Sequence, residues 1–382
     1  MSRTTYPAGS GYAAWNSLTL NFREPWKVEE ELSLFKVPSA TLGDDHDSRI
    51  GDLMAKITGT PKVFGTSLSG QLAAWFPWTN PKTQLGTQVF PASDLPFVVN
   101  LRDGKIITYS GAALTKMPVM SLAPNKPLIG PVEWTALVAT GAKVGDTAAL
   151  SAVSSGSYTE PQWDPTDELF DTYTLSLGTT TSLTSGATTN SSTSATCAST
   201  DGLIVGQGIT GTGIPAATTI AAITSATAFT LSAAATATNT GLTFALTART
   251  FTPDKDGITF TPTVTMEPVK PAMKATDNMR VTGITAVIEF RPIDMNVADF
   301  YALLPAEGYG VALGGSVRTR GPALSVVGSA TGKVSLTANR VARAGNSSLA
   351  FSNKDPRADK VQLQLLQQYA SGWQPLFTLG VV

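Results

Sequence analysis

A weak internal repeat at an offset of 228 residues constrains the fold of this chain more than any other sequence feature. A repeat determines how many structural units must be explained, so it is considered before local motifs. The identities are sparse, and matches of Ala, Gly and Val also arise by chance among β-prone segments. The identical pairs are Ala74 and Ala302, Pro77 and Pro305, Leu85 and Leu313, Gly86 and Gly314, Val89 and Val317, Val98-Val99 and Val326-Val327, Gly104-Lys105 and Gly332-Lys333, Asn125-Lys126 and Asn353-Lys354, and Leu137 and Leu365.

Two predicted helices agree at the same offset. Residues 66–77 predict a short helix with a Thr or Ser cap, and Pro77 ends it. Residues 294–305 predict a second helix of the same length, capped by Asp294 and ended by Pro305. The agreement in local structure carries more weight than the identities.

A strand precedes and a hairpin follows each predicted helix. The strands are expected over 53–60 and 281–290, and the hairpins over 97–109 and 324–336. The Asp103-Gly104 pair within the first hairpin is a strong turn signal. We infer a duplicated β-rich unit, with coincidence among β-prone segments as the alternative.

A strand leading to Glu-Pro is expected near the start of each copy, over Ser17–Pro25 and Ile258–Pro268. This match requires a different offset, 243, and therefore a gap. The expected organisation is a first domain with an N-terminal arm over 1–175 (the repeat beginning near residue 15), an insert over 176–249 and a second domain over 250–382.

The segment 178–247 differs from the rest of the chain, because it is rich in Ser, Thr, Ala and Gly and Asp201 is its only charged residue. Its short alternating apolar runs, separated by Gly and Thr turns, predict strands. A flexible linker is the alternative, but linkers lack the apolar residues of a core. We expect a small separate β-module that projects outward. The expected core residues are Ile204, Ile209, Ile214, Ile220, Ile223, Phe229 and Leu231.

The composition favours a β-rich subunit that buries much of its surface against neighbours. Charged residues make up 14% of the chain, against about 25% in a typical soluble protein. Hydrophobic residues make up 42%, which excludes a disordered chain. The 34 Gly, the 24 Pro and the abundant Thr and Val favour strands and turns with a few short helices. A net charge of -1 provides no large basic patch for nucleic acid.

Cysteine content and hydropathy limit the cellular compartments in which this chain can be expected. Cys197 is the only cysteine, which excludes an intrachain disulfide framework. Residues 1–14 contain no apolar run of signal-peptide length, and no window approaches a membrane span. We therefore expect a chain that is made in a cytoplasm, stays there until it is released, and has no membrane partner.

His46 is the only histidine, and it lies among acidic residues in the segment 43–47. A metal or acid–base site is one interpretation, because histidine and carboxylates are ligand types. Consecutive residues cannot all face one ion, and the sequence has no second histidine. A solvated loop is therefore the simpler interpretation, and the acidic runs Glu29–Glu31 and Asp44–Asp47 are interpreted in the same way.

Three other patterns have simpler interpretations than the chemistry they suggest. Residues 206–211 match GxGxxG, but residues 212–215 cannot begin the helix that a dinucleotide site requires, so a turn in a β-module is expected. Residues 65–70 lack the spacing of a nucleophile elbow, and a serine nucleophile would have only His46 as base. The aromatic cluster over 75–78 is expected in a core or subunit contact before a stacking platform. We predict no catalytic, cofactor-binding or metal-binding residues.

Several segments carry a distinctive combination of strand and turn residues. They are Val89–Val99, Gly104–Thr108, Ala113–Leu122, Glu133–Leu137 and, in the second half, Asp277–Ile284. These segments resemble the tail tube proteins of siphophages and related prophages. In the insert, residues 206–215 and 229–233 resemble small β-modules carried by many phage tail proteins. Together the similarities cover most of the chain.

The resemblance implies a mainly β fold of the tail-tube type, a sandwich or barrel of antiparallel sheets with short helices. In that family two packed sheets and a flanking helix form a ring with their neighbours, and inner strands close a barrel around a DNA channel. The chain is twice the usual length, so two tandem tube domains per chain are implied. A ring of three chains would then imitate the six-domain ring of simpler members.

The resemblance also implies function and partners. It implies a structural virion protein of the tail, assembled in the host cytoplasm, that is not an enzyme and needs no cofactor. Its expected partners are further copies of itself and other tail proteins such as the tape measure and terminator. DNA is expected to pass through the lumen without specific binding.

Two other functions stay open from the sequence. A tail-tip, fibre or decoration protein that binds the host surface would suit the insert equally well, and would differ from a tube subunit in its low copy number. A small hydrolase acting on cell-wall or capsular polymers would need paired carboxylates in a cleft, and the sequence offers no such pair.

Overall fold

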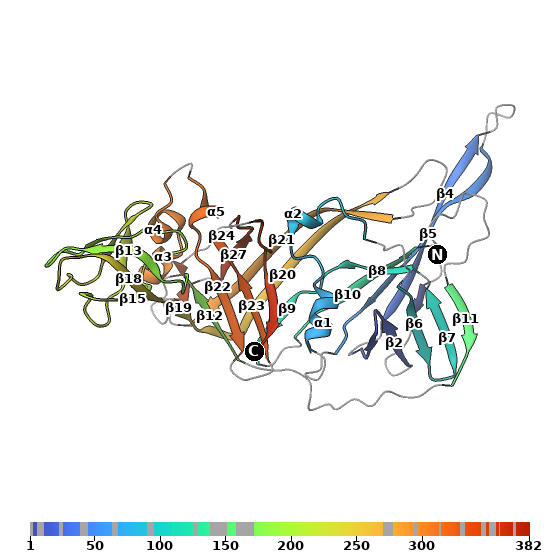
Figure 1. The fold of residues 1–382 in the computed structure, drawn as a ribbon. Coiled ribbons are helices and arrows are strands. Elements are labelled where there is room, and N and C mark those ends of the chain that lie inside the picture. Colours follow the sequence, from blue (N-terminus) through green and yellow to red (C-terminus); the bar gives the residue numbers. More distant parts are fainter. Residues whose placement is uncertain are drawn as a thin grey trace.

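The computed structural model describes the chain except for residues 1–2, 6–10, 23–25, 39–44, 63–67, 90–94, 110, 125–127, 138–150, 158–171, 270–277, 294–296, 313–314, 329–332, 345–348, 351–356, 359 and 370–371. As the sequence predicts, the fold is mainly β, with antiparallel sheets and short helices. The described part is elongated, with the first half at one end, the insert at the other and the second half between them (Figure 1).

The described residues of the first half form two five-stranded antiparallel sheets. The first sheet has the order β8 (Gly111–Lys116), β10 (Val132–Leu137), β5 (Asp45–Gly59), β4 (Lys27–Pro38) and β1 (Arg3–Thr5). The second has the order β11 (Ser151–Ser155), β7 (Lys105–Tyr109), β6 (Phe97–Leu101), β2 (Gly11–Trp15) and β3 (Leu18–Leu20).

The described residues of the second half form two sheets of the same size. One has the order β24 (Arg340–Arg343), β27 (Val361–Leu366), β21 (Asn278–Pro292), β20 (Pro253–Val269) and β9 (Met120–Leu122). The other has the order β28 (Thr378–Val381), β23 (Val334–Ala338), β22 (Leu324–Gly328), β12 (Tyr173–Leu177) and β19 (Arg249–Phe251). A short ribbon pairs β25 (Leu349–Ala350) with β26 (Arg357–Ala358).

Both sheets of the second half repeat the strand order of the first. Each half has a long hairpin (β4–β5 and β20–β21), then a helix, then a short hairpin (β6–β7 and β22–β23). The same strands are neighbours in both halves: Trp134 of β10 lies opposite Ile57 of β5, and Leu363 of β27 lies opposite Ile288 of β21. The two halves therefore share one topology.

Two of the described helices, α1 (Leu68–Trp75) and α3 (Val297–Ala302), lie within the ranges that the repeat predicts, and the other three were not predicted. These three are α2 (Pro81–Gln84), α4 (Pro305–Tyr309) and α5 (Val317–Arg320). The expected caps, residues 66–67 and Asp294, lie outside the described residues. Pro305 follows the end of α3 as predicted, but it also begins α4, since proline suits the first position of a helix.

The insert, residues 178–248, leaves the second half at the position of a tight turn in the first. β2 and β3 are joined by Asn16 and Ser17, with φ of 49° and 63°. A two-residue hairpin with positive φ at both positions is a type I′ turn. In the second half, the corresponding strands β12 and β19 pair Leu177 with Arg249, and the insert fills the interval. The insert therefore replaces a hairpin turn and leaves the strand pairing unchanged.

The insert is a folded β-module, as predicted, rather than a linker. Its described strands have the order β15 (Gly208–Thr210), β18 (Asn239–Thr247), β13 (Leu183–Thr188), β14 (Ser194–Thr196), β17 (Ala228–Leu231) and β16 (Ile220–Ile223). Phe229 and Phe244 are buried and meet edge to face at 6.1 Å. Most of the predicted core residues form the buried core of the module, and Ile214 is partly buried against them. Ile204 is an exception, because it is buried in the core of the two halves and not in that of the module.

The two halves share one continuous hydrophobic core, whereas the insert has its own. In the first half Trp134 is fully buried, 5.1 Å from Phe97 and 5.9 Å from Trp15 between ring centroids. In the second half Phe260 and Phe377 meet at 4.9 Å. The part of the core in the first half is therefore rich in tryptophan, and the part in the second half is built around phenylalanine.

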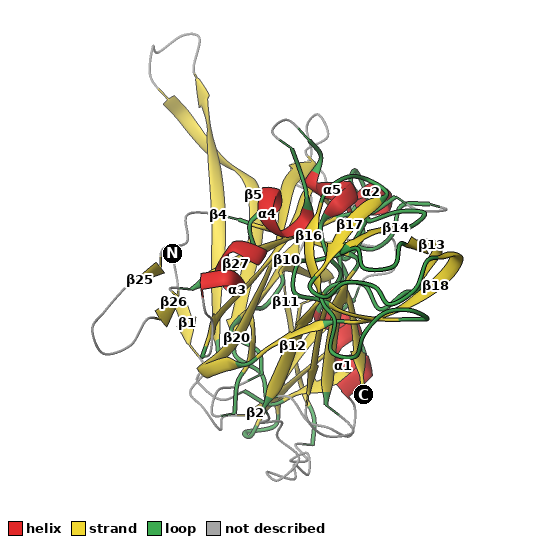
Figure 2. Cartoon of the chain, turned by 90° about the vertical axis from the view of Figure 1, so that its left-hand side faces the viewer, coloured by secondary structure: helices red, strands yellow, loops and turns green. Residues whose placement is uncertain are grey.

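Two acidic runs that were expected in loops lie in strands. Glu29–Glu31 belongs to β4, and residues 45–47, including His46, begin β5; Asp44 lies outside the described residues. Backbone pairing with the neighbouring strand stabilises this long hairpin whatever the polarity of its side chains, and the last two glutamates remain exposed. Figure 2 shows the hairpin extending well beyond the body of the molecule.

Strand pairing also corrects two expected alignments. β12, expected at the end of the first domain, pairs with β19 and β22 of the second half, so the boundary lies before Tyr173. The Glu-Pro match was wrong, because β3 corresponds to β19. Pro268 lies far along β20, opposite Met279 near the hairpin turn, whereas Pro25 precedes β4 in sequence.

Candidate functional site

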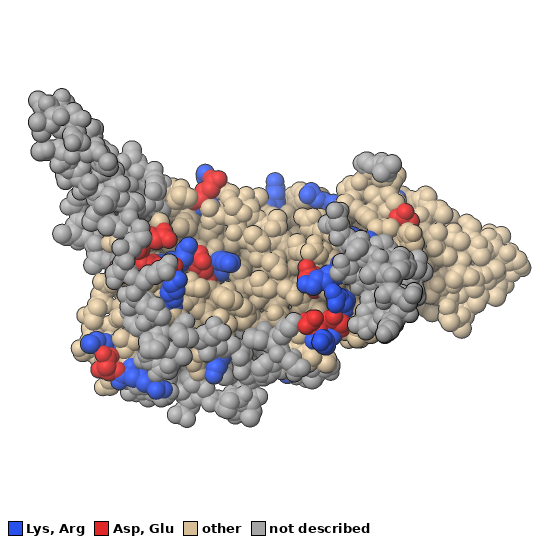
Figure 3. Space-filling model, turned by 180° about the vertical axis from the view of Figure 1, so that it is seen from behind, with Lys and Arg blue, Asp and Glu red and all other residues tan. Residues whose placement is uncertain are grey.

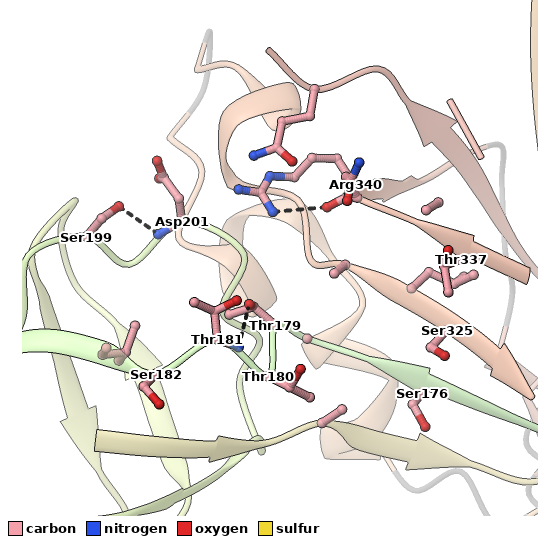
Figure 4. A pocket seen from close by; sticks show the side chains of 18 of the residues that line it. Ser176, Thr179, Thr180, Thr181, Ser182, Ser199, Asp201, Ser325, Thr337 and Arg340 are labelled. Carbon is pink, nitrogen blue, oxygen red and sulfur yellow. Dashed lines mark hydrogen bonds between the residues drawn. The ribbon is translucent and has the colours of Figure 1, made fainter. Parts of the chain in front are cut away.

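A polar cavity of about 640 Å³ lies between the insert and the second half. Ser176 on β12, Ser325 on β22 and Thr337 on β23 line one side, and insert residues including Thr179 line the other (Figure 4). Ser and Thr predominate in its walls. The chemistry of the cavity depends on its ionisable groups.

Asp201 and Arg340 are the ionisable residues among those that line this cavity. Burial lowers the pKa of Arg340, and the negative charge of Asp201 opposes that shift. The guanidinium donates a hydrogen bond to the carbonyl of Asn339 at 3.0 Å. Glycoside hydrolysis requires two carboxyl groups flanking the bond, and this cavity has one carboxylate among its lining residues.

The GxGxxG segment, residues 206–211, begins with a turn inside the insert, and the predicted turn is confirmed. Gly206 has φ of 84° and is followed by Gln207 and β15. Gln207 is fully buried, donates to the carbonyl of Thr179 and accepts from the amide of Ile204. Gly206 therefore lies in a turn of the β-module, and the buried side chain of Gln207 stabilises that turn through its two hydrogen bonds.

Metal and thiol chemistry find little support in the described part of the chain. No three His, Cys, Asp or Glu side chains gather there as a metal site would require, and the side chain of His46 lies outside it. Cys197 is buried, and its Sγ donates to the carbonyl of Ser199 at 3.2 Å. Burial raises the pKa of this thiol, which keeps it protonated and unreactive.

The aromatic cluster after the first helix is confirmed as core. Trp75 and Phe76 are buried, and Trp78 packs against the same core. Phe76 lies 6.1 Å from Phe260 of the second half. The cluster therefore belongs to the contact between the halves.

Strands β8 and β9 extend the contact between the halves. β8 closes one edge of the first half's sheet, and β9 follows three residues later on the edge of the second half's sheet. Leu122 lies opposite Ile258 and Met120 opposite Phe260, and all four are buried. Gly257 has φ of 72°, and a Cβ there would lie 2.3 Å from the carbonyl oxygen of Leu122. One run of chain thus joins the two sheets edge to edge.

The segment after α2 pairs with the beginning of β21. The amide of Gly86 donates to the carbonyl of Val281 at 2.8 Å, and the amide of Val281 donates to Thr87 at 3.0 Å. The amide of Val89 donates to the carbonyl of Met279 at 2.8 Å. Gly86 and Val89 are repeat identities, which is the sequence signal that pointed to this segment without revealing its role.

Polar side chains complete the same contact. The carboxamide of Asn80 accepts from Gln367 at 2.6 Å and donates to the carbonyl of Trp373 at 3.3 Å. Gln84 accepts from the amides of Thr79 and Asn80, which holds this loop in shape. No sequence pattern predicted these residues, because their partners lie far away in the chain.

The insert docks on the second half through polar contacts and through Ile204, which is buried in the core of the halves. Arg320 donates to the hydroxyl of Thr200 at 3.2 Å, and Arg249 donates to the carbonyl of Val205 at 2.6 Å. The amide of Val205 donates to the carbonyl of Gly308 at 3.0 Å. In Figure 3 the charged side chains gather over the two halves, and the tip formed by the insert is bare of them.

A scan against models of known protein families finds no match, and neither does a search of curated proteins. Among the described residues, the helices are too short or too polar to cross a membrane.

Proposed function

We propose that this chain is the major tail tube subunit of a long-tailed bacteriophage, a structural virion protein that assembles into stacked rings. The shared strand order of the two halves is the observation that supports this proposal most. Two like units joined by a heterologous contact can repeat that contact with the next chain, and the assembly closes when the rotation divides the circle.

Rings of three chains follow from this proposal together with the family resemblance. Each chain supplies two units, so three chains supply the six units of a simpler ring. The insert is attached to one unit of each pair, and the true symmetry is therefore threefold with a sixfold appearance.

The low charge fits a channel for DNA ejection. Each cation–phosphate contact in the lumen would add affinity and slow the passage of DNA. The chain carries 27 basic and 28 acidic residues, so net attraction to DNA is small. In the virion its partners are further copies of itself and other tail proteins such as the tape measure and terminator, with assembly in the host cytoplasm.

Negative-stain images of the purified protein test the proposal. We expect rings or tubes whose end-on averages have threefold symmetry with a pseudo-sixfold outline, and isolated rings with the mass of three chains. Rings of six chains would contradict the duplicated arrangement. A protein that stays monomeric at every concentration and salt condition would contradict the tube itself.

DNA binding offers an independent test. In a filter or mobility assay at physiological salt we expect only weak binding of duplex DNA. A Kd on the order of 10⁻⁸ M or tighter lies in the range of specific DNA-binding proteins and would argue against a passive channel.

A tail-tip, fibre or decoration protein is the second candidate. The insert favours it, because a module with its own core and a nearly uncharged surface suits binding to a host surface. The copy number separates the two: a tube subunit is among the most abundant virion proteins, and a tip protein is present in a few copies. Quantitative mass spectrometry of purified virions measures this ratio.

A further inference from the structure

Helix α1 of the first half covers the edge strand β28 of the second half. Leu72, Ala73 and Phe76 line a cavity of about 270 Å³ together with Phe377 and Leu379. Leu72 and Phe76 are buried there, and Leu379 is partly buried. The contact joins the outer face of a short helix to the outermost strand of a sheet.

The strand that corresponds to β28 in the first half is β11, which is also the edge strand of its sheet. Val153 of β11 lies opposite Ile107 of β7, as Leu379 of β28 lies opposite Leu336 of β23. Val153 is 68% exposed, although Leu379 at the equivalent position is partly buried. An exposed apolar position on an edge strand is a feature of interaction surfaces.

The helix that corresponds to α1 in the second half is α3, and Tyr301 on α3 is exposed, as Ala73 is on α1. Tyr301 lies 228 residues after Ala73 and is 51% exposed. Its neighbours Ala302 and Leu303 are buried, and Asp299 forms an ion pair with Arg249, so α3 is anchored in the second half. Tyr301 therefore lies on a helix that is held in place by contacts within its own half.

Within one chain these two surfaces lie at opposite ends of the molecule, so they do not meet there (Figure 1). We propose that α3 of one chain packs on β11 of the next chain, with Tyr301 against Val153. This repeats between chains the contact that α1 makes with β28 within a chain, and it rests on the proposed function. Ala73 lines the cavity in the contact within one chain. The side chain of Tyr301 is larger than that of Ala73 and would fill more of such a space.

Chemical cross-linking tests the contact. In a Cys197→Ser background, Val153→Cys combined with Tyr301→Cys and treated with a short bismaleimide should give covalent dimers and trimers on a denaturing gel. Each single-cysteine variant should give no ladder. The matched control is Ala73→Cys combined with Leu379→Cys, which should cross-link within one chain and remain monomeric in mass.

A charge on either surface gives a second measurement. Val153→Glu and Tyr301→Glu should each reduce ring formation at least tenfold. The isolated Val153→Glu chain should keep the melting temperature of the wild type, because Val153 is exposed in it. Thr240→Glu, at an exposed strand position of the insert, should assemble like the wild type.

Two results would overturn the proposal in different ways. Wild-type rings that yield no cross-linked chains, and glutamate variants that assemble normally, would refute this contact and leave the tube function standing. A wild-type chain that never associates would refute both.

Discussion

The two halves of this chain have the same topology, yet they differ at one hairpin. In the first half, β2 and β3 are joined by Asn16 and Ser17, and in the second half the corresponding strands are joined by the whole insert. The pairs next to the junction, Trp15 with Leu18 and Leu177 with Arg249, are equivalent. Since two adjacent antiparallel strand ends lie close together, a folded module can replace a turn with little loop-closure cost.

A second difference lies in the cores. On the corresponding strands β10 and β27, the first half buries Trp134 and the second half buries Leu363, and both side chains are fully buried. A shared topology with different packing indicates that strand order depends on the pattern of buried positions more than on the identity of the residues there.

Removing these two side chains tests whether the cores contribute equally. Trp134→Ala is expected to lower the free energy of unfolding by about 3–5 kcal/mol, and Leu363→Ala by about 2–5 kcal/mol. Urea unfolding followed by tryptophan fluorescence and circular dichroism measures both. Because the halves share one core, both variants should shift a single transition. Two separate transitions would show that the halves unfold independently.

Gly257 tests how firmly β9 ties the halves together. Gly257→Ala should cost about 1–2 kcal/mol for the left-handed backbone alone, and more because the new Cβ would meet the Leu122 carbonyl. Gly241→Ala is the matched control, since Gly241 has φ of 68° and open space around its Cβ position. Equal losses in the two variants would show that β9 moves aside freely. Amide exchange at Met120–Leu122 reports the opening of β9 directly.

Ser17 tests the turn that distinguishes the halves. Its φ of 63° costs a non-glycine residue free energy, so Ser17→Gly should raise the free energy of unfolding by about 0.5–1 kcal/mol, in line with the Asn-Gly preference of type I′ turns. Ser154→Gly in β11 should instead lower it by roughly the same amount, because glycine weakens a strand. A destabilising Ser17→Gly would argue against the turn geometry.

Replacement of the insert should have the smallest effect on assembly. With residues 178–248 replaced by Asn-Gly, β12 and β19 gain the turn that joins β2 and β3, and rings should form as in the wild type. Negative-stain imaging and ring mass measure this. A shortened chain that folds, by circular dichroism, but does not assemble would place the insert in the wall of the ring.

Features that depend on neighbouring residues were predicted from the sequence, whereas pairings between residues far apart in the chain were not. The Asp103-Gly104 signal predicted the β6–β7 hairpin, and Gly104 has φ of 82° there, as such turns require. The boundary near residue 175 was misplaced because the partner of β12, β19, lies beyond the insert and no local pattern marks the pair. The polar strand at Glu29–Glu31 was not predicted for a related reason. It is stabilised by pairing with β5, which its own composition does not indicate.

The candidate site was predictable only in outline. The repeat identities Gly86 and Val89 pointed to a segment with some shared role, and the structure places it along β21. The hydrogen bonds of Asn80 with Gln367 and Trp373 depend on residues far along the chain. Single positions of ordinary polar residues give no periodic signal, so such contacts emerge only from the folded topology.

The turn at Asn16 and Ser17 has a practical consequence. It has the same strand geometry as the root of the insert, but it is occupied by only two residues. Each chain therefore has a second position, the turn between β2 and β3, whose strand geometry matches that of the position that carries the insert. A foreign epitope or a second copy of the insert placed between Trp15 and Leu18 would enter and leave through adjacent strand ends, which makes this turn the natural position for displaying peptides on this chain.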